Sequence, residues 1–282
     1  MKLTQATADV FVPDGAELPG ALERSTHVGI GAHQDDLEFM AFHGIAECFG
    51  RSDRWFCGVT CTNGAGSPRA GVYAEYTDER MRVVRRAEQR AAACVGRYGA
   101  MIQLDHPSSA VKNPAHPALR DDLLAILRAA RPRVVYTHNP ADKHDTHVAV
   151  VSAALAALRA LPPAARPERV LGCEIWRDLD WLPDARKVLL DVSEREHLAA
   201  ALSGVFDSQI SGGKRYDAAV LGRRRAHATF FESHGVDQAV MLTFAMDLMP
   251  LVADPSLSLA AYVAGLVEEF KADVLGKLAP WK

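Results

Sequence analysis

Short apolar runs alternate with longer amphipathic stretches along the first half of the chain. The short runs have the length and composition of β-strands, and the long stretches repeat their apolar residues at the spacing of an α-helix. This order of strand and helix is typical of βαβ units, which build a mostly parallel sheet covered by helices on both faces. We therefore predict a Rossmann-like, doubly wound α/β fold, with extra strands and helices in the C-terminal half.

The pattern also predicts where the elements lie. The expected strands are residues 27–32, 55–60, 101–104, 133–138, 170–176 and 187–192. The expected helices are residues 37–49, 76–98, 118–130, 147–161, 193–206, 215–233, 239–249 and 257–278. We expect an N-terminal arm over 1–25, a main domain over 26–235 and a helical extension over 236–282. That extension packs either on its own domain or on another subunit, so a homo-oligomer is left open.

Composition narrows the classes of partner. The formal net charge is −3 and no stretch is rich in Lys and Arg, which argues against nucleic acid as a partner. No apolar run approaches the roughly 18 residues of a membrane helix, and the N-terminus lacks the apolar stretch of a signal peptide. The five cysteines form no CxxC pair and suggest no disulfide framework. We expect a cytoplasmic protein without membrane insertion.

The first predicted strand runs directly into a polar turn that contains two aspartates. Dinucleotide-binding folds place a GxGxxG motif here, but Gln34 stands at the third glycine position. Asp35 and Asp36 would also repel a phosphate. An imidazole and two carboxylates within four residues instead suit a cation, with His33 and Asp36 as the ligands. Helix capping by the aspartates is the alternative interpretation.

A second polar turn follows the predicted strand 133–138 and holds three histidines: His138, His144 and His147. His144 and His147 are three residues apart, so they can share one face of the helix that begins there. In a doubly wound sheet this turn can lie beside the first one. One of its histidines would then complete a His/Asp/His triad, although each taken singly could be a surface or capping residue.

Three nitrogen and oxygen ligands with one open position are typical of catalytic zinc, whereas structural zinc has four protein ligands. Zinc lowers the pKa of water and polarises a carbonyl group, and a neighbouring carboxylate can accept the proton of that water. This chemistry is the hydrolysis of an amide or an ester.

These residues resemble the motifs of the PIG-L (LmbE-like) zinc-dependent N-deacetylases. The family pattern AHPDD corresponds to residues 32–36, AHQDD, and the family's HxxH corresponds to residues 144–147, HDTH. The segment from Arg85 to Glu88 is similar to the family's RxxE helix, and the turn 62–64 is similar to the TNG turn after its second strand. The resemblance covers about residues 25 to 235.

The resemblance implies a role for each matching residue. His33, Asp36 and His147 would hold one Zn²⁺ per chain, or another divalent metal. Asp35 would be the general base, and His144 would stabilise the oxyanion or protonate the leaving amine.

Substrate contacts are expected farther from the metal. The resemblance implies that Arg85 contacts substrate hydroxyl groups. His106 follows the third predicted strand and Asn63 lies in a glycine-rich loop, so both are candidates for substrate binding, as is Asp142. The substrate would be a small N-acyl amino sugar, since family members remove acetyl from N-acetylglucosamine conjugates.

Two positions depart from the family pattern. Gln34 replaces a proline, which should reduce the rigidity of the first turn. Thr146 replaces the aspartate of the family's HPDH, so the carboxylate that would tune His144 is missing. Unless Asp142 or Asp145 replaces it, the pKa of His144 should be low and His144 should be a weaker acid.

Downstream residues have less specific interpretations. Trp176 and Trp181 either offer an aromatic platform for a sugar or pack in the core. Arg223, Arg224 and Arg225 are expected on a solvated helix face.

Three functions follow from these observations. The first is a zinc-dependent N-deacetylase that acts on an N-acetylglucosamine-type conjugate. The second is a zinc amidohydrolase for an amide that is not a sugar. The third is a binding protein that retains the metal site and has lost turnover.

Overall fold

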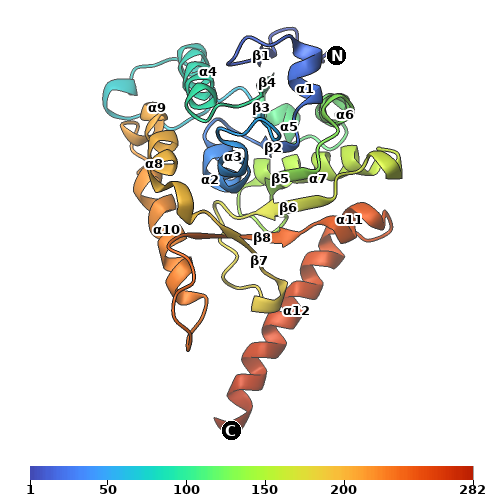
Figure 1. Cartoon of the computed structure of the whole chain (residues 1–282), viewed down its shortest axis with the longest axis vertical. Coiled ribbons are helices and arrows are strands. Elements are labelled where there is room, and N and C mark those ends of the chain that lie inside the picture. Colours follow the sequence, from blue (N-terminus) through green and yellow to red (C-terminus); the bar gives the residue numbers. More distant parts are fainter. Residues whose placement is uncertain (282) are drawn as a thin grey trace.

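A single mixed sheet of eight strands forms the centre of the molecule (Figure 1). The computed structural model describes residues 1–281. The strands are β1 (Asp9–Phe11), β2 (His27–Gly31), β3 (Phe56–Thr62), β4 (Ala100–His106), β5 (Val134–His138), β6 (Arg169–Cys173), β7 (Val188–Asp191) and β8 (Leu242–Asp247). Their order across the sheet is β1-β4-β3-β2-β5-β6-β8-β7.

Twelve α-helices are described within residues 1–281. They are α1 (Leu18–Glu23), α2 (Asp36–Met40), α3 (Phe42–Cys48), α4 (Asp78–Val95), α5 (Ser108–Val111), α6 (Ala118–Ala130), α7 (Asp145–Arg159), α8 (Glu196–Gly204), α9 (Asp207–Ile210), α10 (Tyr216–Phe230), α11 (Met249–Ala253) and α12 (Leu259–Leu278). None of them, in the described part of the chain, combines the length and apolar character that crossing a bilayer requires.

The central strands are parallel, and apolar side chains cover both faces of the sheet. Strands β4, β3, β2, β5 and β6 pair in parallel, as the βαβ pattern predicts. One apolar core packs α6, α7 and α11 on one face, and a second packs α2, α3, α4 and α8 on the other (Figure 1). The doubly wound α/β fold is therefore confirmed.

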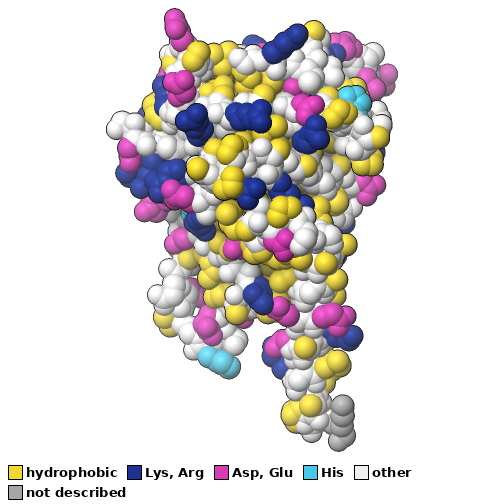
Figure 2. Space-filling view, turned by 90° about the vertical axis from the view of Figure 1, so that its right-hand side faces the viewer, with side chains coloured by type: hydrophobic (Ala, Val, Ile, Leu, Met, Phe, Trp, Pro, Cys, Tyr) yellow, Lys and Arg dark blue, Asp and Glu magenta, His cyan; other side chains and the backbone are white. Residues whose placement is uncertain are grey.

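Both terminal segments contribute a strand that the sequence pattern did not predict. Strand β1, within the arm 1–25, pairs antiparallel with β4. Strand β8 pairs antiparallel with both β6 and β7, so the helix expected over 239–249 is wrong, and the segment 236–282 is only partly helical. Helix α12 then projects away from the body and carries exposed apolar side chains (Figures 1 and 2).

The order of the strands fixes where a ligand would bind. Strand β2 is followed in the chain by its neighbour β3, whereas its other neighbour, β5, comes after β4. The connections therefore leave β2 and β5 toward opposite faces of the sheet, and such a switch point opens a crevice at the carboxyl ends of the strands. The two polar turns singled out from the sequence follow β2 and β5.

Candidate metal centre

Helix α2 follows β2 after the turn 32–35 and lies close to it because Gly31 has no side chain. A Cβ atom on Gly31 would lie 3.0 Å from Cβ of Asp36 and 3.3 Å from Cδ2 of Leu37. Between strand and helix, Asp35 adopts a left-handed backbone with φ of 88°. Such a conformation costs a residue other than glycine about 1–3 kcal/mol and persists only where its surroundings hold it.

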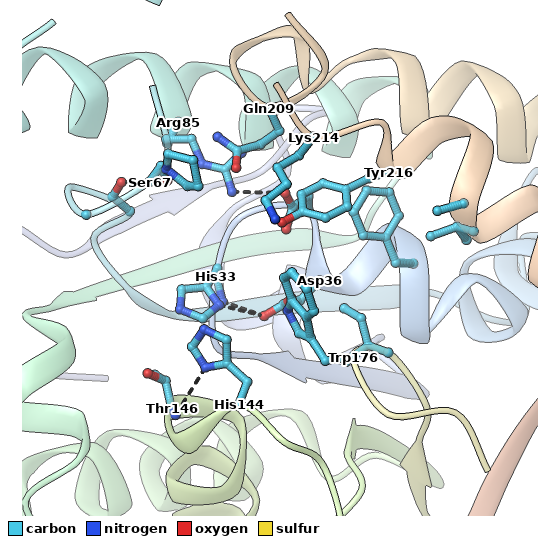
Figure 3. Close-up of a pocket in the computed structure, with 18 of the residues that line it drawn as sticks. His33, Asp36, Ser67, Arg85, His144, Thr146, Trp176, Gln209, Lys214 and Tyr216 are labelled. Atoms are coloured by element: carbon cyan, nitrogen blue, oxygen red, sulfur yellow. Dashed lines mark hydrogen bonds and ion pairs between the residues drawn. The ribbon is translucent and has the colours of Figure 1, made fainter. Parts of the chain in front are cut away.

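Three donor atoms from the two turns converge on one point. His33 Nδ1 lies 3.3 Å from Asp36 Oδ2, and His147 Nε2 lies 3.3 Å from His33 Nδ1 and 3.5 Å from Asp36 Oδ2. The contact between His33 and Asp36 is drawn in Figure 3. Ligands about 2.0–2.1 Å from a tetrahedral ion lie roughly 3.3–3.4 Å apart, so the spacing and chemistry of these donors fit zinc.

His138 offers an alternative ligand that the resemblance did not assign. Its Nε2 lies 3.4 Å from Asp36 Oδ2, and its ring stacks on that of His147 with centroids 3.8 Å apart. However, Nε2 of His138 accepts a hydrogen bond of 2.9 Å from the backbone N–H of Ala32. This bond occupies the lone pair that a metal would need, so the geometry favours His33 over His138.

Asp142 orients His147 from behind. Asp142 Oδ2 lies 3.1 Å from His147 Nδ1, and Oδ1 accepts a hydrogen bond of 3.2 Å from the backbone N–H of His144. A proton on Nδ1 of His147 leaves its Nε2 lone pair free to face Asp36. Carboxylates commonly fix the orientation of ligating histidines in this way. Asp142 was expected to contact substrate, but the structure places it behind His147 and outside the pocket lining.

Charges in the two turns are arranged for a cation beside a basic carboxylate. Burial raises the pKa of Asp36, but the nearby His147 and His138 outweigh it and hold that pKa well below its usual range. Burial raises the pKa of Asp35 to about 7; Arg85 opposes this shift, and the charge of Asp36 adds to it. Asp36 is therefore suited to bind a metal and Asp35 to exchange a proton.

A pocket of about 640 Å³ opens over these residues. His33, Asp35, Asp36 and His144 line it, and His33, Asp36 and His144 are labelled in Figure 3. Lys112, Trp176, Lys214, Tyr216 and Arg223 also line it.

Comparison with known families agrees with this geometry. The family model described as PIG-L, GlcNAc-PI de-N-acetylase, matches residues 28–158. These residues form a PIG-L domain. The domain contains both polar turns and Arg85, whereas three other residues of the pocket, Trp176, Lys214 and Arg223, lie beyond it in the sequence. A search of curated protein sequences gives no match.

Solved structures show the same fold. The conserved protein TT1542 from Thermus thermophilus is 20% identical over 83% of this chain and 99% of its own, with a TM-score of 0.60. N,N'-diacetylchitobiose deacetylase from Pyrococcus horikoshii is 17% identical over 81% of this chain and 86% of its own, with a TM-score of 0.58. The 4-carboxy-2-hydroxymuconate hydratase GalB from Pseudomonas putida KT2440 is also 17% identical, over 79% and 96%, with a TM-score of 0.58. A deacetylase and a hydratase share this fold, so the reaction must be argued from the site.

The two departures from the PIG-L motifs have different consequences. Gln34, in place of proline, is buried and donates hydrogen bonds to the carbonyl of Thr62 (3.1 Å) and to Oε1 of Gln103 (3.2 Å), so these bonds hold the turn. The second departure is Thr146, which stands where the family has an aspartate. No carboxylate among residues 1–281 lies within ion-pair distance of the His144 ring. Burial, with a smaller contribution from His33, lowers the pKa of His144.

Arg85 of the PIG-L domain lines the pocket but is engaged with the proposed base. Its Nη2 donates to Asp35 Oδ2 at 3.1 Å and also to the carbonyl of Gln34. The backbone N–H of Asp35 donates to Gln89 Oε1 at 3.1 Å. Arg85 and Gln89, both on α4, therefore hold Asp35 in its left-handed conformation.

Two expected substrate contacts lie outside the pocket lining. His106 is buried, with Nε2 2.9 Å from Asp122 Oδ2 on α6 and Nδ1 3.3 Å from the side-chain nitrogen of Gln5. Asn63 accepts a hydrogen bond of 3.1 Å from the backbone N–H of Ala65 and serves as a turn residue.

Residues of the second half of the chain complete the pocket, and only some were singled out from the sequence. Trp176 lines the pocket, whereas Trp181 packs against Phe270 of α12. Arg223 lines the pocket and Arg224 is buried, donating to the carbonyls of residues 38 and 39, so the solvated face expected for them is wrong. Lys214 and Tyr216 belong to no local motif and gave no signal.

Proposed function

We propose that this protein is a metal-dependent N-deacetylase, with zinc as the metal, that hydrolyses the acetyl or acyl group of an N-acetylglucosamine-type conjugate. The observation that carries the proposal is the triangle of donor atoms from His33, Asp36 and His147, with Asp35 beside it. The PIG-L domain over residues 28–158 supports the same reaction. The aromatic wall formed by Trp176 and Tyr216 is suited to stack against a sugar ring.

In this proposal His33, Asp36 and His147 hold the metal. A bound divalent ion polarises the amide carbonyl and lowers the pKa of water. Asp35 accepts the proton of the attacking water, whose oxygen forms the new bond to the carbonyl carbon. His144 stabilises the oxyanion or donates a proton to the nitrogen of the leaving amine as the C–N bond breaks and acetate leaves. Arg85 and Gln89 keep Asp35 aimed into the pocket throughout.

The experiment that tests the proposal measures amine release from a panel of N-acetylated sugars and N-acyl amino acids with zinc present. Asp35→Asn should retain zinc, because Asp35 is no ligand in this proposal, and should lose about 10²–10⁴-fold in rate, the usual contribution of a general base. Asp121→Asn, an exposed carboxylate on α6, is the matched control.

Full activity in Asp35→Asn would refute the assignment of the base. Release from acyl amino acids but not from amino sugars would favour the amidohydrolase of a non-sugar amide. Zinc binding with no release from any compound would favour a binding protein.

A further inference from the structure

Besides Arg85, three cationic side chains line the pocket. Lys112 at the end of α5, Lys214 in the loop before α10, and Arg223 on α10 all line it. Within residues 1–281 none of the three lies within ion-pair distance of a carboxylate. Among the residues that the structure describes, the acidic ones in the lining are Asp35 and Asp36, both beside the candidate metal ligands. The protein as a whole carries a formal net charge of −3, so these three unpaired cations differ in sign from the net charge of the molecule.

The aromatic wall connects these cations to the proposed reaction centre. Nζ of Lys214 lies 5.3 Å from the ring centroid of Trp176, and the Trp176 ring lies 6.2 Å from that of His144. The Tyr216 ring meets Trp176 at 90°, with centroids 5.9 Å apart. In Figure 3, Lys214 and Tyr216 lie across the pocket from His33 and His144. A sugar stacked on Trp176 with its acetamido group toward His144 would direct another substituent toward Lys214.

Arg223 is held in place on the same wall. One guanidinium nitrogen donates to the carbonyl of Ile175, the residue before Trp176. This bond fixes the side chain and leaves its other N–H groups to a ligand. Half-buried cations with no carboxylate partner keep their attraction for an anion, and low-dielectric walls concentrate their field. An anionic oxygen between Lys214 and Arg223 would therefore be bound strongly.

We propose that the substrate carries a negatively charged substituent, a carboxylate or a phosphate ester, which Lys214 and Arg223 bind while Lys112 attracts it at the rim. This inference rests on the proposed function for the placement of the acetamido group. Both binding residues lie beyond the PIG-L domain of residues 28–158, so the second half of the chain selects the substrate.

Binding of three ligands by calorimetry tests the proposal independently of turnover. The ligands are N-acetylglucosamine 1-phosphate, the carboxymethyl glycoside of N-acetylglucosamine and its neutral methyl glycoside. The protein is the full chain with zinc and the Asp35→Asn substitution, which blocks hydrolysis. At least one anionic ligand should bind about tenfold or more tightly than the neutral one, as expected for a charge-assisted hydrogen bond. The comparison of the two anions shows which group is preferred.

Variants separate recognition by these cations from binding to the metal. Lys214→Gln and Arg223→Gln should each remove most of the preference for the anion, while Lys214→Arg should keep it. Lys271→Gln on α12 and Arg128→Gln on α6 are matched controls and should not change it. If the anion binds only through zinc, neither Lys214→Gln nor Arg223→Gln should change its affinity.

Equal affinities for charged and neutral ligands, a preference that survives both substitutions, or no binding of any ligand would overturn the proposal. Failure of the proposed function gives a different result. Amine release without preference for charge would leave the deacetylase standing and remove this inference. Charge-selective binding by Lys214 and Arg223 without amine release would support the anion site and remove the proposed deacetylase activity.

Discussion

At the scale of single residues, the site depends on which nitrogen of His147 carries a proton. Asp142 is buried, and although burial raises its pKa, the contributions of His147, His138 and the backbone N–H of His144 together outweigh this, lower the pKa and keep the carboxyl ionised. Ionised Asp142 holds the proton on Nδ1, which directs the Nε2 lone pair toward Asp36. Burial, with His138 adding to it, lowers the pKa of His147 to about 4, so its imidazole is neutral and able to bind a metal at pH 7.

Asp142→Asn should weaken zinc binding by about 10- to 100-fold, the usual effect of losing the carboxylate behind a ligating histidine. Competition with a chelator of known affinity measures this change. Asp145→Asn is the matched control, because Asp145 lies in the same turn but is exposed. Unchanged affinity in Asp142→Asn would show that Asp142 does not orient a metal ligand.

The sequence predicts the candidate metal ligands better than the other residues of the pocket. His33 and Asp36 lie in one short turn, so local spacing indicates that they act together, whereas the choice of His147 among the histidines of the second turn came from the resemblance to the PIG-L motifs. His106 was expected in a loop but is the last residue of β4, and its side chain lies against α6 and Gln5 because neighbouring strand residues alternate between faces. Lys214 and Tyr216 reach the pocket from a loop whose position depends on packing of the second half of the chain, which no local pattern shows.

At the scale of elements, the predicted strands and helices of the first half match the observed ones closely, whereas β8 was predicted as a helix. The residues of β8, apart from its last, are all buried, so the segment shows no alternation of apolar and polar positions. Its run of Leu, Phe, Ala and Met residues is compatible with either element. The segment forms a strand because it pairs with β6 on one side and with β7 on the other. Strand β1 has three residues and is too short for a pattern to identify.

His27 at the start of β2 makes the sheet sensitive to acid. Burial lowers the pKa of His27 to about 4, so the folded protein keeps this imidazole neutral. The unfolded chain takes up the proton near the ordinary pKa of 6.5. Stability is therefore lost as the pH falls from about 6.5 to about 4, by roughly 3 kcal/mol in the free energy of unfolding.

His27→Gln should remove this contribution. Denaturant unfolding at pH 7 and pH 4 measures the contribution. Between these pH values, the free energy of unfolding of the variant should fall by about 3 kcal/mol less than that of the wild type. His234→Gln, at an exposed histidine, should follow the wild type. Parallel pH dependence of His27→Gln and the wild type would contradict the burial of a neutral imidazole.

At the scale of the whole molecule, helix α12 is joined to the body by its first half. Leu266 is its buried residue, Tyr262 donates a hydrogen bond to the carbonyl of Asp247, and Arg186 pairs with Glu269. The second half exposes Val274, Leu275 and Leu278 to the surroundings. The two halves of this helix should therefore contribute very differently to stability.

Leu266→Ala should lower the free energy of unfolding by about 2–5 kcal/mol, the usual cost of truncating a buried leucine. Leu275→Ala in the exposed half should change it by less than about 0.5 kcal/mol. Thermal or denaturant unfolding at low protein concentration compares the two. A large loss in Leu275→Ala would show that the exposed half is covered, for example by a second copy of the chain.

The proposed activity depends on one metal ion held where the turns after β2 and β5 meet. Its most direct test is anomalous scattering at the zinc absorption edge from a crystal of the zinc-loaded protein. We expect a single strong peak within bonding distance of His33 Nδ1, Asp36 Oδ2 and His147 Nε2. A peak bound by His138 in place of His33, or no peak between these turns, would contradict it.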